Sequence, residues 1–401
     1  MTSPLEGIKV VDCSIWIQGP MAASLLGGLG AEVIKVEEPG KGDPNRGLIG
    51  AYFAKGGRSR YFEALNLNKR GITLDLKQEE GKAVIYKLME EADVFMTNFR
   101  FAAARRMGLD YETLSSINPK LVYAQASGWG REGPESERGA YDIAAAARVG
   151  LMYMSGEPKI PPEPQRVPGG ICDVAGAMCF ALGIMGALQA RERIGRGQMV
   201  DTSLFGSAIA LATQNISFAL AFGFDQEYRP RSSIRNPLYS FYKCADGEWI
   251  YLIMMQFDRY WSTFCRITGI EELENDSRFN TLQAMMDNSD QLIPTLDKIF
   301  ATRTRAEWLR IFADHDFPCA PIQRTSDVIN DPQAIANDYI TEFDHPAYGR
   351  EKVVGLPYKF SETPASVSRP CPELGQHTEE VLLELGYSWD DIARLKQGAV
   401  I

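Results

Sequence analysis

Short β-branched runs alternate with apolar, small-residue or amphipathic stretches along the first half of the chain. Residues 8–13 and 31–37 read as strands on either side of a helix at 21–29, which predicts a βαβ unit. The alternation then continues, and it predicts a parallel sheet with helices on both faces. The further strands expected are 72–76, 93–97, 121–126 and 199–204, and the further helices are 79–91, one ending at 107, 174–191 and a long one ending near 222.

The pattern changes at residues 228–237, which are basic, polar and interrupted by prolines. This segment is typical of a linker. A hairpin over 239–254 and helices up to Phe312 follow it, and they predict a smaller α+β domain. A second break lies near 331–332, before a tail with two short amphipathic helices. The expected domains are a large one over 1–225, a small one over 226–330 and a return to the large one over 331–401.

Composition narrows the class of protein. The chain has 401 residues, 45% of them hydrophobic, and a net charge of -10, which argues against nucleic acid or an anionic membrane as a partner. We find no run of about twenty uninterrupted apolar residues and no basic segment followed by an apolar one at the N-terminus. We therefore expect a soluble, cytoplasmic protein.

The sequence gives little indication of a metal site or of catalysis by histidine. The seven cysteines are scattered without a Cys-x-x-Cys pair, and the three histidines have no metal-binding spacing. The first βα loop, 14–20, lacks the Gly-x-Gly-x-x-Gly fingerprint, which disfavours NAD. Basic residues outnumber acidic ones between 35 and 106, which fits either a solvated helix face or a phosphate site. Catalysis would have to use carboxylates and the backbone.

Asp173 is the carboxylate of greatest interest, because it follows a glycine-rich loop and precedes a long apolar helix. We expect the helix to begin at Val174, so that Asp173 lies at its N-terminus and stays ionised at neutral pH. Two interpretations are open at this point. Asp173 is either an ordinary helix N-cap or a nucleophile held where a bulky thioester can approach.

Motifs distributed over nearly the whole chain resemble the class III CoA-transferase family, the formyl-CoA and carnitine type. No single motif is specific for this family, but the occurrence of all of them in this order along the chain is. They are Pro4-Leu5-Glu6-Gly7-Ile8, Gly19-Pro20, 29–37, Gly42-Asp43, Asn68-Lys69-Arg70, 74–77, Asn98-Phe99-Arg100, Asn118-Pro119, Gly128 with Gly130 and Gly133-Pro134, Tyr141-Asp142, Asp173, Gly195 with Gly197-Gln198, and 374–378.

The resemblance implies a fold and a set of site residues. The fold is an α/β one, with a Rossmann-like large domain built from both chain ends, a small domain, and two chains interlocked as a dimer. Asp173 becomes the nucleophile, with Tyr141 and Asp142 beside it, although Asp142 could equally be the N-cap of 143–149. The resemblance also implies a set of CoA contacts: Gln18, Leu74, Lys77, Asn98, Phe99, Arg100 and Arg106. The alternative is that these residues only cap the end of a strand and form a solvated helix face.

The implied reaction moves CoA from an acyl-CoA to a carboxylic acid through an aspartyl-CoA thioester, with no permanently bound cofactor and no metal. CoA thioesters are then substrates, and the partner is a second copy or a related subunit. The loop 16–20 is similar to that of benzylsuccinate CoA-transferase subunits. This similarity favours succinyl-CoA as donor and benzylsuccinate or another hydrophobic dicarboxylate as acceptor.

Three departures from the family pattern stand out. Apolar residues at Ile15, Ile17 and Leu48 replace polar or aromatic ones and predict an apolar acyl pocket. Glu38 stands where a basic residue often contacts the adenosine phosphates. The segment 235–237 stands where some members have a glycine-run lid.

Two other functions are alternatives. An α-methylacyl-CoA racemase shares the fold, but it needs a histidine at the position that Tyr141 occupies here, and a phenol is a poor base at neutral pH. A non-catalytic CoA-binding subunit of a heteromeric transferase would have no need of Asp173.

Overall fold

A computed structural model describes residues 2–47, 54–55, 58–154, 163–225, 231 and 234–401. Contacts divide the chain into two compact units. The first comprises Met1–Met152, Arg166–Asp225 and Ala336–Ile401, and the second comprises Tyr153–Gln165 and Gln226–Ile335.

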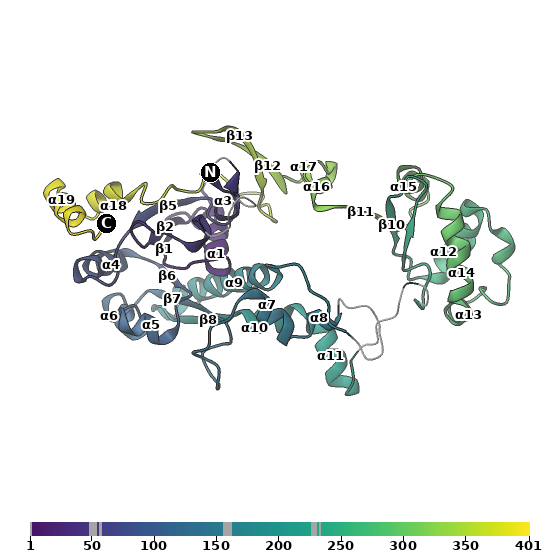
Figure 1. Ribbon diagram of the computed structural model, residues 1–401, viewed down its shortest axis with the longest axis horizontal. Helices are drawn as coiled ribbons and strands as arrows, with labels where there is room; N and C mark the ends of the chain where they lie inside the picture. Colours follow the sequence, from purple (N-terminus) through teal and green to yellow (C-terminus); the bar gives the residue numbers. More distant parts are fainter. Residues whose placement is uncertain (1, 48–53, 56–57, 155–162, 226–230, 232–233) are drawn as a thin grey trace. The chain divides into compact units, whose positions relative to one another are not determined.

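A six-stranded sheet with all neighbouring strands parallel forms the centre of the first unit (Figure 1). Its order is β5-β2-β1-β6-β7-β8, which confirms the parallel sheet predicted from the sequence. Counted along the chain, this is the doubly wound order 3-2-1-4-5-6, in which ligands bind beyond the strand carboxyl ends where the order reverses. That point lies between β1 and β6. The strands are β1 (Lys9–Asp12), β2 (Glu32–Glu37), β5 (Lys69–Thr73), β6 (Val94–Thr97), β7 (Val122–Ser127) and β8 (Met199–Ser203).

Two apolar cores cover the two faces of this sheet. On one face, Phe95 and Tyr123 pack with the helices after β5 and β6 and with the end of the chain. On the other face, the residues of β1, β6 and β7 that point the opposite way pack against Leu26 and Phe180. Burial on both faces explains why the strands read as continuous apolar runs. The helices of this unit are α1 (Gln18–Gly28), α3 (Arg60–Leu65), α4 (Glu79–Glu91), α5 (Phe101–Arg106), α6 (Tyr111–Ile117), α7 (Asp142–Arg148), α9 (Ile171–Ile194), α10 (Leu204–Leu211), α11 (Thr213–Phe222), α18 (Thr378–Glu384) and α19 (Trp389–Gln397), and α8 (Leu151–Met154) lies at its boundary.

The long helix expected up to residue 222 is divided in two. α10 and α11 meet at Ala212 with a bend of 73°. At the bend, the Thr213 hydroxyl donates a hydrogen bond of 2.6 Å to the Ala210 carbonyl, a local bond that competes with a continuous helix. The apolar pattern alone did not reveal this break.

Among the described residues, α9 is long and apolar enough to cross a membrane by length and composition, and α10 with α11 would pass the same test as one bent span. α9 nevertheless packs against α1, β7 and β8, and Phe180 and Ile184 are fully buried. These contacts are those of a core helix.

The second unit contains a three-stranded antiparallel sheet and a group of helices. Its sheet has the order β11-β10-β9, and the hairpin expected near 239–254 is formed by β9 and β10. An aromatic core that includes Phe264, Phe300 and Trp308 holds the unit together. Its elements are β9 (Phe241–Lys243), β10 (Trp249–Leu252), β11 (Cys319–Ile322), α12 (Phe257–Thr268), α13 (Leu282–Asp287), α14 (Ser289–Phe300), α15 (Arg305–Ala313) and α16 (Thr325–Val328), with α17 (Pro332–Ala336) at its boundary.

The tail of the chain returns to the first unit. Its α18 and α19 lie beside β5 and α4 (Figure 1), and the α18 residue Thr378 accepts a hydrogen bond of 3.0 Å from the Thr73 N–H. Two small hairpins were not foreseen: β12 (Ile340–His345) with β13 (Gly349–Val354), and β3 (Ala54–Lys55) with β4 (Arg58–Ser59). Within the described part of the chain, Cys13, Cys172, Cys244 and Cys265 are buried thiols that form no disulfide.

Candidate active site

Three helices begin near Asp173. α9 precedes a strand of the parallel sheet and therefore runs antiparallel to it, so its N-terminus lies at the carboxyl edge, as does that of α1. α9 also packs against α7. Gly170 adopts φ 88 as the N-cap of α9, a left-handed conformation that suits glycine. The helix begins at Ile171, so the expected start at Val174 was wrong and Asp173 lies in the first turn.

Asp142, and not Asp173, caps α9. Its Oδ1 accepts hydrogen bonds from the N–H groups of Cys172 (2.7 Å) and Asp173 (3.1 Å). Asp142 is itself the first residue of α7, whose N-cap is Tyr141, so it does not cap its own helix. Its other oxygen, Oδ2, is buried and has no hydrogen-bond partner among the described residues. The arrangement places two carboxylates side by side.

This neighbour changes the charge expected on Asp173. Asp173 is 9% exposed, and burial together with the Asp142 carboxylate raises its pKa from 3.8 to about 7, against a lowering effect of the Gln18 backbone N–H. The expectation of a fully ionised Asp173 at neutral pH was therefore wrong. The N–H groups of Cys172 and Asp173, at the start of α9, bond to Asp142 and not to the Asp173 carboxylate.

Gln18 lies beside the nucleophile candidate. It is the first residue of α1 and is 4% exposed. Its side chain crosses α9 at Gly176, where an added Cβ would come within 2.7 Å of Nε2. This buried Nε2 has no hydrogen-bond partner among the described residues. An amide donor is thus available one turn from Asp173.

Aromatic and aliphatic residues adjoin Gln18 and Asp142 along the chain. Trp16, at φ 70, packs edge-on against Tyr141 with ring centroids 5.7 Å apart. Tyr141 is 65% exposed, so its phenol lies at the rim of the site and not in the core. Ile15 and Ile17 are half-buried, whereas Leu48 lies outside the described residues.

A buried set of charges holds the loop that carries these groups. Lys69 Nζ donates to Asp12 Oδ2 and to the Pro20 carbonyl, both at 2.8 Å. Lys35 Nζ donates to the Ser14 carbonyl at 2.9 Å and to Asp43 Oδ2 at 3.1 Å. The two lysine side chains and their two carboxylate partners are wholly buried. Two buried ion pairs therefore hold the loop 14–20 through hydrogen bonds from their lysines to the Ser14 and Pro20 carbonyls.

Asn98 anchors the same loop from the side. Its Nδ2 donates to the Ile15 carbonyl (2.6 Å), and its Oδ1 accepts from the Ile15 N–H (3.0 Å). The amide thus joins the ends of β1 and β6, where the strand order reverses. Asn98, expected to contact CoA, has its side chain committed to the loop.

The other residues expected to contact CoA follow β5 and β6 at the same edge of the sheet. Leu74 is only 1% exposed and belongs to the apolar core, and its N–H donates to the Glu37 carbonyl at 2.9 Å. Lys77 is exposed and forms an ion pair with Glu38 at 3.0 Å. Phe99 is half-buried against the same core. Arg100 and Arg106 are exposed at the two ends of α5.

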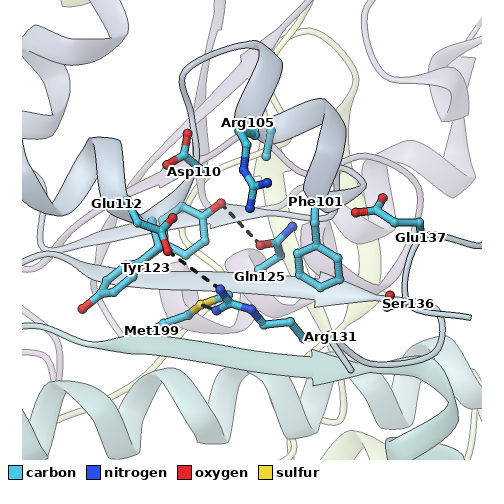
Figure 2. Close-up of a pocket in the computed structure, with 12 residues that line it drawn as sticks. Phe101, Arg105, Asp110, Glu112, Tyr123, Gln125, Arg131, Ser136, Glu137 and Met199 are labelled. Atoms are coloured by element: carbon cyan, nitrogen blue, oxygen red, sulfur yellow. Dashed lines mark hydrogen bonds and ion pairs between the residues drawn. The ribbon is translucent and has the colours of Figure 1, made fainter. Parts of the chain in front are cut away.

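A cavity of about 170 Å³ lies on the α5 and α6 side of the sheet (Figure 2). Arg105 points into it, whereas Arg106 does not line it. Its floor is formed by Tyr123 and Gln125, side chains of β7 that face away from α9. Asp173 is not among the lining residues, so this cavity is separate from the carboxylate pair.

Sequence reasoning missed Tyr61. This residue of α3 has a raised pKa, caused first by burial and then by the charges of Asp173 and Asp142. Its phenol therefore lies within the field of both carboxylates. No motif pointed to it, because the short helix α3 follows a segment without clear periodicity.

The second unit holds residues 235–237, where the family lid was expected. There Asn236 donates from Nδ2 to the Met254 carbonyl at 3.3 Å. In the part of the chain that the structure describes, no group of three or more His, Cys, Asp or Glu side chains could hold a metal ion.

The fold and the site define a doubly wound α/β protein with a buried carboxylate pair at its ligand-binding edge. Residues 5–378 match CoA-transferase family III. The chain is 32% identical to the (R)-2-hydroxy-4-methylpentanoate CoA-transferase of Clostridioides difficile, over 99% of both chains. It is 34% identical to the succinyl-CoA:glutarate CoA-transferase of Mus musculus, over 99% of this chain and 90% of that one.

A solved structure agrees with these relatives. The CaiB/BaiF family protein from Brucella suis superposes with a TM-score of 0.86 and 31% identity, over 96% of this chain and 100% of that one. The chain therefore belongs to CoA-transferase family III. It is an enzyme of the class III CoA-transferase type, which uses CoA thioesters and carboxylic acids as substrates.

Proposed function

We propose that Asp173 is the covalent nucleophile of this transferase. The observation that carries the proposal is the pair formed with Asp142, which leaves the Asp173 anion poorly stabilised in a buried site. A carboxylate with little stabilisation of its charge is the more reactive one. The sequence pattern favoured the same residue.

The proposed reaction exchanges acyl bonds without water. The Asp173 carboxylate attacks the thioester carbonyl, the C–S bond breaks, and CoA thiolate leaves behind a mixed anhydride. The thiolate then attacks the aspartyl carbonyl, which forms the aspartyl-CoA thioester and releases the donor acid as its carboxylate. The acceptor carboxylate repeats these steps in reverse and regenerates Asp173.

Gln18 is placed to assist each attack. Its unpartnered Nε2 can donate to a carbonyl oxygen that gains negative charge. The buried position also keeps water from the thioester, which would otherwise be hydrolysed. Tyr141, on the rim, packs with Trp16 and closes one side of the site.

For the substrates we propose succinyl-CoA as donor and an apolar dicarboxylate such as benzylsuccinate as acceptor. Trp16, Tyr141, Ile15 and Ile17 provide apolar surface next to the carboxylate pair. Such surface gains more from an aryl or alkyl group than from a very small acid.

Exposed apolar side chains support the interlocked dimer. Leu182 on α9 is 74% exposed, and Leu220 and Phe222 on α11 are 82% and 61% exposed. Apolar surface of this kind is usually covered in an assembly. We place the enzyme in the cytoplasm. The mass of the purified chain, alone and co-expressed with a related subunit, distinguishes a homodimer from a heteromer.

A transfer assay tests the function. The purified protein is incubated with succinyl-CoA and a panel of acids, and the new thioesters are identified by mass. Transfer to benzylsuccinate or a similar acid is expected to exceed transfer to oxalate or formate. Faster transfer to oxalate or formate would contradict the substrate assignment. Deuterium exchange at the α-carbon of a branched acyl-CoA, without transfer, would indicate a racemase instead.

A further inference from the structure

Glu38 lies directly after β2 and holds two lysines. Its Oε1 forms ion pairs with Lys41 Nζ at 2.9 Å and Lys77 Nζ at 3.0 Å. Lys77 follows β5, so the three charges lie beyond the carboxyl ends of two neighbouring strands. They remain accessible, because the Glu38 side chain is 41% exposed and the lysines are 72% and 70% exposed.

A second carboxylate completes this charge cluster of Glu38, Lys41, Lys77 and Asp75. Asp75 accepts a hydrogen bond from the Lys77 N–H at 3.0 Å, and both lysines lower its pKa, after the bonds from Lys77 and Gln78. Two cations and two anions therefore meet at this place, and its formal charge is zero. The nearest acid inside β2, Glu37, is not available, since Arg46 binds both of its oxygens.

Cationic side chains without an ion pair to any described residue lie elsewhere on the carboxyl edge of the sheet. Arg100, Arg105 and Arg106 of α5 form no ion pair within the described part of the chain. α5 follows β6, at the point where the strand order reverses and ligands bind in this fold. Among the described residues, positive charge is thus unpaired after β6 and neutralised at the end of β2.

In dinucleotide-binding proteins with this strand order, the residue at the end of the second strand contacts the ribose of the nucleotide. An acidic residue there binds ribose hydroxyl groups, whereas a basic residue accommodates a ribose phosphate. CoA carries such a phosphate on its 3′-oxygen, with a charge of about -2. At the Glu38 cluster this phosphate would meet no net positive charge, and the carboxylates of Glu38 and Asp75 would repel it.

We propose that Glu38 makes this enzyme nearly indifferent to the 3′-phosphate of CoA, so that 3′-dephospho-CoA and its thioesters bind almost as well as CoA and its thioesters. The inference rests on the proposed transfer of CoA and on the adenosine lying along this edge. The Glu38 cluster would then determine how strongly the enzyme distinguishes CoA from 3′-dephospho-CoA.

Binding and turnover with the two forms of the coenzyme test the proposal. Calorimetry measures the Kd of CoA and of 3′-dephospho-CoA, and kcat/KM is measured with the two succinyl thioesters. The variant Glu38→Gln removes one of the two repelling charges and releases both lysines from their ion pairs with Glu38. The matched control Glu91→Gln removes the same charge from the opposite edge of the sheet, where Glu91 pairs with Lys9.

In the unaltered enzyme, the preference for the phosphorylated form is expected to stay below about fivefold. Glu38→Gln should raise this preference about two- to fivefold by tightening CoA alone, and salt should weaken the gain. Glu91→Gln should leave it unchanged. A preference above a hundredfold in the unaltered enzyme, or equal effects of the two variants, would overturn the inference. Absence of transfer with normal CoA binding would contradict only the proposed function.

Discussion

Two buried aspartates in the first unit show opposite responses to burial. Asp12, at the end of β1, is wholly buried, and its pKa is nevertheless lowered. Burial by itself would raise that pKa, but the charges of Lys69 and Lys35 and the hydrogen bonds from Lys69 and Ser14 outweigh it. Asp173 is also buried, but its nearest charged neighbour is another carboxylate, and its pKa rises to about 7.

The comparison separates a structural carboxylate from a reactive one. Every oxygen of Asp12 is bonded, and its charge is balanced by a lysine 2.8 Å away. Near Asp173, the first N–H groups of α9 bond to Asp142, and the Gln18 backbone N–H lowers the Asp173 pKa without offsetting the rise. Burial therefore says little about function on its own, and the partners of the buried charge decide whether it stabilises the fold or is available for chemistry.

The largest effect is expected for Asp173→Asn, which removes the nucleophile. Transfer should fall by at least about 10⁴-fold, because an amide cannot form the anhydride. Steady-state assays with purified protein measure this loss. The control Asp110→Asn keeps an N-cap acceptor on α6 and should retain activity within about twofold. Near-normal transfer by Asp173→Asn would contradict the assignment of Asp173 as the reactive carboxylate and Asp12 as the structural one.

Asp12→Asn should destabilise the fold strongly. The wholly buried Lys69 would lose its counter-charge, at a cost of about 3–5 kcal/mol in the free energy of unfolding, whereas Lys35 keeps its ion pair with Asp43. Urea unfolding at pH 7 measures this change. The exposed pair of Lys9 and Glu91 serves as the control, and Lys9→Met should have a much smaller effect. Equal effects of the two variants would mean that the buried ion pair contributes no more to the free energy of unfolding than the exposed one.

Asp173→Asn should have the opposite effect on stability, and only above pH 4. The folded-state pKa of about 7 exceeds the ordinary 3.8, so ionising Asp173 destabilises the fold progressively as the pH rises from about 4 to 7. The variant should therefore be more stable than the parent at pH 8, by about 2–4 kcal/mol, and equal to it near pH 4. Unfolding midpoints across this range provide the test. A variant less stable at pH 8 would contradict the raised pKa.

Asp142→Asn should have the smallest effect. The amide oxygen can still cap α9, but the charge that raises the Asp173 pKa is lost. The rise of kcat/KM with pH, which follows ionisation of Asp173, should move to lower pH by up to about one unit. A pH profile identical to that of the parent would assign the raised pKa to burial alone. Asp142→Ala, which also removes the cap, should in addition destabilise the fold.

Much of the fold could be predicted from periodicity. The helix expected over 79–91 has those bounds in the structure, and the strands of the parallel sheet were placed to within a few residues. The break between α10 and α11 could not be predicted, because both halves are apolar and the bend depends on a local hydrogen bond.

The site was less accessible to sequence reasoning. The position of Asp173 on a glycine turn was visible, but its pairing with Asp142 joins residues 31 positions apart through the fold. Lys35 was expected in a strand and Lys69 belonged to a family motif, and neither was expected to be buried, although both are wholly buried under the loop of the site. Such partners become evident only when the sheet brings separate segments together.

The most direct test of the central claim locates the covalent intermediate. The enzyme is incubated with succinyl-CoA without an acceptor, treated with hydroxylamine and digested, and the modified peptide is identified by mass spectrometry. The account predicts an acid-to-hydroxamate change at Asp173 that requires the thioester and is absent in Asp173→Asn. Modification of another residue, or a normal yield of adduct in that variant, would contradict it.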